Sequence, residues 1–184
     1  YGGGLVSGDH IDLNFDVGSH TRLLSLTQGS TKVYCERRTG DPPAVRNQAQ
    51  PARPVSKQYF RYIVRPDATL IILPAPVTCF ARSRYDQTQL VDLRDAHTSS
   101  LILLDWFTSG RLFVDGPKES TDMDRIPEFW HFYQYRSRNE VRVNGQVIAR
   151  DCLDLSQDLP ENMKRDEPTD LSRRCAPYTC YATL

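Results

Sequence analysis

The sequence predicts an all-β protein with few or no helices. Apolar and polar residues alternate in several short segments, turn-forming residues separate these segments, and no stretch carries apolar residues at helical spacing over three turns. A chain of 184 residues is long enough for one domain with a substantial core. We therefore expect residues 1–184 to form a single β domain.

The first strand shows the alternation most clearly. Residues 11–17 read IDLNFDV, so an apolar residue stands at every second position and Asp or Asn stands between. Period two places the apolar side chains on one face of a half-buried strand and the polar ones in water. Similar patterns predict further strands at 22–26, 32–36, 57–64, 69–73, 84–93 and 99–107.

A hairpin is predicted near the C-terminal third of the chain. Asn144-Gly145 lies between the alternating runs 141–143 and 146–148. Both turn residues tolerate the positive φ of a type I′ turn, which makes this pair the strongest local hairpin signal.

Three polar segments, rich in proline or charge, are predicted to be loops: 39–54, 116–127 and 156–170.

We find no internal repeat at a fixed period. At the N-terminus Tyr1 leads directly into a glycine turn, and at the C-terminus the strand-like run 178–184 stops, so we expect the domain to be incomplete at both ends.

Composition argues against several functions. The 23 basic and 23 acidic residues give zero formal charge, which is not typical of a nucleic-acid binder or a polybasic membrane surface. No apolar run approaches the roughly 20 residues of a membrane helix.

The five cysteines lack zinc-site spacing and favour reduced thiols in a cytoplasmic protein. Cys79 and Cys152 are predicted to be small core residues.

Four motifs follow one another along the chain: GGGLVSGD at 2–9, TQGSTKVY at 27–34, LPAPVTCF at 73–80 and LDWFTSGR at 104–111. The run PYTCYATL at 177–184 continues the series. In order and spacing these motifs resemble the UreD (also called UreH) family of urease accessory proteins. One departure is Ile71-Ile72, which stands where the family commonly has Glu-Trp.

The resemblance implies stacked, helically wound β-sheets without a known catalytic activity. It also implies a scaffold that binds UreF and the GTPase UreG, docks on the urease apoprotein, and conveys nickel through a water-filled tunnel. Nickel is then cargo in transit, with no cofactor stably bound and no stable metal site. Nucleic acid and membrane are not expected partners.

The family positions implicated in the nickel route correspond to Asp9, Thr31 and Asp105, with possible support from Lys32, Arg111 and His10. Isolated carboxylates in a wet passage suit weak binding of a borderline metal ion.

Each position also has a structural explanation. A buried Asp105 requires a partner, and an ion pair with Arg111 explains it equally well. Thr31 is a favoured strand residue and Lys32 a paired strand charge. His10 points away from its neighbour Asp9 if both lie in one strand, so a surface histidine is favoured.

Two other functions stay open on sequence alone. One is an all-β hydrolase that uses Asp105 or Asp9 with a histidine, although neither G-x-S-x-G nor H-E-x-x-H is present. The other is a ligand-binding module with exposed aromatic residues on one strand, namely Trp130, Phe132 and Tyr133.

Overall fold

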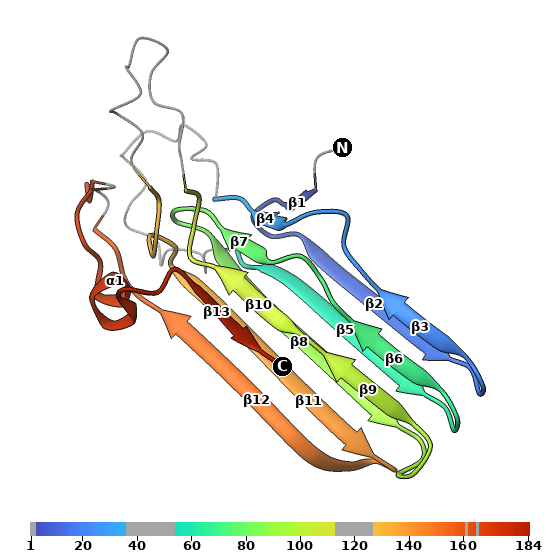
Figure 1. Cartoon of the computed structure of the whole chain (residues 1–184). Coiled ribbons are helices and arrows are strands. Elements are labelled where there is room, and N and C mark those ends of the chain that lie inside the picture. Colours follow the sequence, from blue (N-terminus) through green and yellow to red (C-terminus); the bar gives the residue numbers. More distant parts are fainter. Residues whose placement is uncertain (1–2, 36–53, 113–126, 161, 165) are drawn as a thin grey trace, which may run out of the picture.

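The computed structural model describes residues 3–35, 54–112, 127–160, 162–164 and 166–184. These residues form three β-sheets and one short helix, which confirms the predicted all-β class (Figure 1). Among them, no helix has the length and apolar character needed to cross a membrane.

The chain winds through the three sheets in the same order three times. The first turn of this coil is β2 (His10–Val17), β3 (Arg22–Ser25) and β4 (Thr31–Val33); the second is β5 (Ser56–Val64), β6 (Thr69–Ile72) and β7 (Val77–Cys79); the third is β8 (Arg84–Leu93), β9 (Ser100–Leu103) and β10 (Asp105–Thr108). Equivalent strands of successive turns pair in parallel. This stacking is the helically wound arrangement that the resemblance implies.

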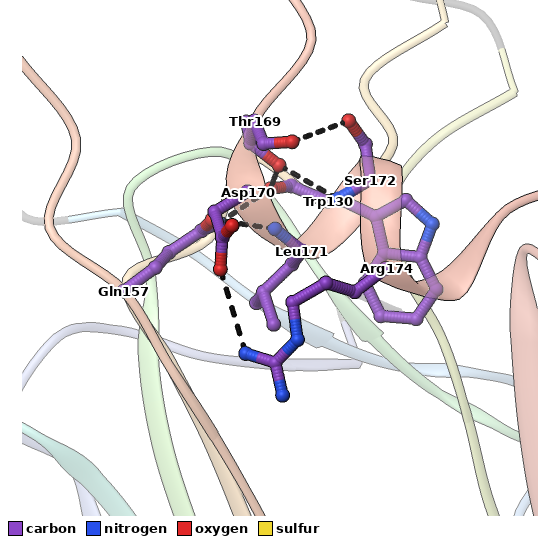
Figure 2. A network of polar contacts seen from close by, with 7 residues as sticks. All are labelled: Trp130, Gln157, Thr169, Asp170, Leu171, Ser172 and Arg174. Atoms are coloured by element: carbon purple, nitrogen blue, oxygen red, sulfur yellow. Dashed lines mark hydrogen bonds and ion pairs between the residues drawn. The ribbon is translucent and has the colours of Figure 1, made fainter.

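Further elements extend the sheets: β1 (Gly4–Leu5) beside β4, β11 (Gln134–Val143) beside β8, β12 (Gln146–Ser156) beside β11, and β13 (Cys180–Thr183) beside β10. Strands β11 and β12 form the predicted hairpin, with φ of 49° at Asn144 and 83° at Gly145. The helix α1 (Asp170–Cys175) begins after Thr169, whose Oγ1 accepts a hydrogen bond from Ser172 N at 3.0 Å (Figure 2).

The long strands form one layer, and the two sheets of short strands lie end to end in the facing layer (Figure 1). The core between the layers contains two apolar clusters. The first cluster includes Tyr85, Phe107 and Tyr135. The second cluster includes Leu70 and Val91.

The predicted strand 99–107 is wrong as a single element. Leu104 separates β9 from β10, which belong to different sheets. Sequence periodicity missed the break because both halves are apolar. The coil also has no fixed period, since its long strands begin at His10, Ser56, Arg84 and Gln134. The predicted loops at 39–54 and 116–127 lie outside the described residues, apart from Pro54 and Pro127.

The prediction of an exposed aromatic binding surface is also wrong. Trp130, Phe132 and Tyr133 are buried, and they precede β11 rather than forming a strand. All five cysteines are free; Cys79 is buried as predicted, whereas Cys152 is exposed on β12.

Candidate functional site

A polar layer separates the two apolar clusters inside the coil. Pairing across β5, β8 and β11 places Gln58, Gln87 and Ser137 in one row, and Gln89 and Asn139 in the next. Asp105 reaches the same layer from β10 in the facing sheet. We define the polar layer by these six side chains: Gln58, Gln87, Gln89, Asp105, Ser137 and Asn139.

The alternation within β8 explains why the glutamines point inward. Every second side chain of a strand points to the same face. Tyr85 and Val91 are buried, and Gln87 and Gln89 lie at the alternate positions between them, so they point to the same buried face. Strand β11 repeats the pattern, since Ser137 and Asn139 lie two and four residues after buried Tyr135 and point to the same face. Sequence reasoning missed these four polar residues, although the parity of each strand was a usable signal.

The Asp105 carboxylate, on a residue that is 8% exposed, accepts three hydrogen bonds from neutral side chains. Gln87 Nε2 lies 3.1 Å from its Oδ1. Ser137 Oγ and Asn139 Nδ2 lie 2.5 and 2.8 Å from its Oδ2. A carboxylate accepts hydrogen bonds through both oxygens, so these three donors converge on one buried side chain.

Neighbouring groups orient these donors. The Tyr85 hydroxyl lies 2.7 Å from the side-chain oxygens of both Gln58 and Gln87, so the amide nitrogen of Gln87 faces Asp105. Likewise, Gln89 Nε2 donates to Asn139 Oδ1 at 3.0 Å, so the amide nitrogen of Asn139 faces Asp105. Burial raises the pKa of Tyr85 well above its ordinary value, and nearby charges including Asp105 add to the effect, so the hydroxyl keeps its proton.

The predicted ion pair between Asp105 and Arg111 is wrong. Arg111 instead pairs with buried Glu128, at 2.5 Å between Nε and Oε2, and its guanidinium lies over the Phe80 ring at 4.1 Å. Within the described residues, no Lys, Arg or His forms an ion pair with Asp105. Among the described residues, the side-chain partners of the Asp105 carboxylate are therefore neutral.

Asp105 and Thr31 line one small cavity of about 90 Å³. By volume, such a cavity has room for a few water molecules. A larger and more open pocket of about 710 Å³ adjoins it, because Thr27, Thr31 and Gln58 line both. Lys32 lines the larger pocket. The structure thus brings Asp105 and Thr31 together, with Lys32 on the adjoining pocket.

Asp9 and His10 lie elsewhere, and neither lines the two pockets. The Asp9 carboxylate accepts a hydrogen bond from Val6 N at 2.7 Å and closes the turn that contains Gly8, whose φ is +91°. His10 is exposed at the start of β2. In this structure Asp9 therefore has a local structural role.

The cavity offers a cation one carboxylate together with neutral amide and hydroxyl oxygens. In the part of the chain that the structure describes, no group of three or more His, Cys, Asp or Glu residues could hold a metal ion. A single carboxylate among neutral oxygens suits a weakly held, hydrated ion better than a tightly coordinated one.

Fold and site together define a coiled, mainly parallel β protein with a small polar cavity that the carboxylate of Asp105 lines. The sequence profile of the UreD urease accessory protein family matches residues 1–184. The chain belongs to this family.

Curated relatives agree with the family match. The chain is 32% identical over 186 residues to urease accessory protein 4 of Cryptococcus neoformans, an alignment that covers 100% of the chain and 55% of the relative. It is 36% identical over 155 residues to urease accessory protein UreD of Anaeromyxobacter, covering 84% of the chain and 42% of the relative. Urease accessory protein D of Arabidopsis thaliana is 36% identical over 141 residues, covering 77% and 38%. The chain spans about half the length of these relatives.

Proposed function

We propose that this chain conveys nickel ions during urease maturation, as part of a scaffold with UreF, UreG and the urease apoprotein. In this proposal the ions pass through the polar cavity and meet Asp105 on the way. Membership of the urease accessory protein family supports a role in urease maturation.

The main support is the buried Asp105 carboxylate, which has no cationic partner in the part of the chain that the structure describes. Burying a charge is costly, and proteins usually compensate it with an opposite charge or a metal ion. Here three neutral donors form hydrogen bonds with the carboxylate, and the cavity beside it has room for a cation with some of its water. A counter-charge from the protein would compete with that cation.

The proposal includes no catalytic step and places the protein in the cytoplasm. Ser137 donates to Asp105, but the cavity lining contains no imidazole that could act as a base toward a serine nucleophile. An accessory role without catalysis agrees with the names of the relatives.

The test is urease activation in cells that lack their own UreD, supplied with the full-length protein carrying Asp105→Asn. This change removes the charge and keeps the side-chain size. We expect urease activity and urease-bound nickel to fall at limiting nickel, while UreF pull-down is retained.

Asp9→Asn is the matched control, because it also removes one carboxylate but lies outside the cavity. Unchanged activation with Asp105→Asn would refute the nickel route through this cavity. Loss of UreF binding with the same variant would assign Asp105 a structural role instead.

A further inference from the structure

Three neutral polar residues, Thr27, Thr31 and Gln58, line both the polar cavity and the larger pocket beside it. They therefore mark the junction between the two spaces. Gln58 is half-buried on β5 and lies opposite Gln87 on β8. An amide side chain offers an oxygen acceptor at one end and N–H donors at the other, so its orientation decides what the junction can bind.

The orientation of Gln58 follows from the single proton of the Tyr85 hydroxyl. This hydroxyl lies 2.7 Å from the amide end of Gln58 and 2.7 Å from that of Gln87. A phenolic hydroxyl carries one proton, so it donates to one of the two amides and can only accept from the other. Burial raises the pKa of Tyr85 well above its ordinary value, so the proton stays in place at neutral pH.

Gln87 is the amide that accepts this proton. Its Nε2 lies 3.1 Å from Asp105 Oδ1 and 3.4 Å from Ser137 Oγ, and a half-turn would place its oxygen against the carboxylate. If Gln58 also presented its oxygen to Tyr85, two acceptors would meet at 2.7 Å without a proton between them. A half-turn of the Gln58 amide, whose two ends have nearly the same size, removes this repulsion and lets its nitrogen donate to the Tyr85 oxygen.

We propose that the side-chain oxygen of Gln58 binds a divalent cation at the junction of the polar cavity and the larger pocket, with Tyr85 as the residue that positions it. The inference rests on the proposed function, which supplies the cation. With its nitrogen on Tyr85, Gln58 directs its oxygen away from the hydroxyl, and the residue borders both spaces. The Thr31 hydroxyl supplies a second neutral oxygen at the same junction.

The charges on the two sides of the junction fit a ligand that holds the ion only briefly. Lys32 lines the larger pocket, and its ammonium group repels a cation there. Asp105 lines the cavity, and its carboxylate attracts the cation. Neutral oxygens between these two charges replace part of the ion's water without binding it tightly, so an ion at Gln58 moves on to Asp105.

The test is the binding of Ni²⁺ alone to the full-length protein, measured by titration. Tyr85→Phe removes the group that orients the ligand, a change that should weaken Ni²⁺ binding about tenfold. Gln58→Met keeps the length of the side chain, removes its oxygen and should weaken binding at least as much. Gln28→Met is the matched control and should bind like the unmodified protein, because Gln28 lines the larger pocket but not the cavity.

Gln58→Glu separates positioning from a general structural effect of Tyr85. Both ends of a glutamate carboxylate are oxygens, so its orientation no longer matters. Tyr85→Phe made in the Gln58→Glu background should therefore leave Ni²⁺ binding nearly unchanged. A loss of similar size in the Gln58 and Glu backgrounds would contradict the positioning role.

The outcomes distinguish this inference from the proposed function. Ni²⁺ binding that Asp105→Asn weakens and Gln58→Met leaves unchanged would overturn the role of Gln58 and leave the route past Asp105 in place. Binding that neither change weakens would overturn both.

Proton NMR of the unmodified protein tests the orientation even if a variant fails to fold. The side-chain amide protons of Gln58 should show a strong nuclear Overhauser effect to the Tyr85 ring, and those of Gln87 a weaker one. Amide protons of Gln58 that show no contact with this ring would overturn the assignment.

Discussion

The two apolar clusters and the polar layer between them face the same interior, yet they differ in what holds them. In the first cluster the Phe107 and Tyr135 rings stack at 4.0 Å between centroids. In the second, Phe15 stacks on Tyr62 at 4.9 Å. In the polar layer, directional hydrogen bonds converge on Asp105 instead.

This difference indicates which region mainly stabilises the fold and which region points to a function. Apolar burial is non-directional and stabilises the fold at both ends of the interior. The polar layer adds little net stability, because its groups exchange hydrogen bonds with water for hydrogen bonds with one another. A coil designed for stability alone would continue the apolar packing, so the polar layer is the part that points to a function.

The largest expected effect is in the first apolar cluster. Phe107→Ala removes a ring that is 1% exposed, and should lower the free energy of unfolding by about 3–5 kcal/mol. The measurement is the urea denaturation curve. Tyr181→Ala is the control, because Tyr181 pairs with Phe107 across β10 and β13 but is 53% exposed. Similar losses in both variants would contradict the assignment of stability to the cluster.

The polar layer should respond less. Asn139→Leu removes one donor from Asp105 and one acceptor from Gln89, which should cost about 1–3 kcal/mol of unfolding free energy. The same change made in an Asp105→Leu background should cost less, since the carboxylate that needs the donor is gone. Additive costs in this double-mutant cycle would show that Asn139 and Asp105 are not energetically coupled and would contradict this prediction.

The smallest effect is expected at Tyr62, which belongs to the second apolar cluster and also lines the polar cavity. Burial raises the pKa of Tyr62 to about 12, from an ordinary value of 10.0. Stability from the protonated hydroxyl is present below pH 10 and is lost as the pH rises from about 10 to about 12, because the unfolded chain ionises first.

Tyr62→Phe should therefore flatten the alkaline loss of stability in this pH window, while the ring keeps its stack on Phe15. Denaturation midpoints measured at pH 9 to 12 test this. Tyr181→Phe, at an exposed tyrosine, should leave the curve unchanged. An equal flattening by both variants would rule out burial as the cause.

Much of the fold could be predicted because its signals are local. Alternation within single strands located most β segments, and Asn144-Gly145 located the β11–β12 hairpin. The repeat of the coil could not be found in this way, since the lengths between equivalent strands differ. The break at Leu104 was also missed, because it leaves the apolar character of the sequence unchanged.

The candidate site was predicted only in part. Resemblance selected Asp105 and Thr31, which line one cavity, and also Asp9, which closes a turn outside it. Nickel binding at these positions stays a prediction. The partners of Asp105 were not found, since Ser137 and Asn139 lie 32 and 34 residues away in sequence.

The sequence by itself determined where strands and turns form and which side chains share a strand face, because these properties depend on neighbouring residues. The tertiary structure alone decided which strands stack, and therefore that Gln87, Ser137 and Asn139 meet at Asp105. Parallel pairing between distant segments sets that register, and no periodicity within one segment carries this information.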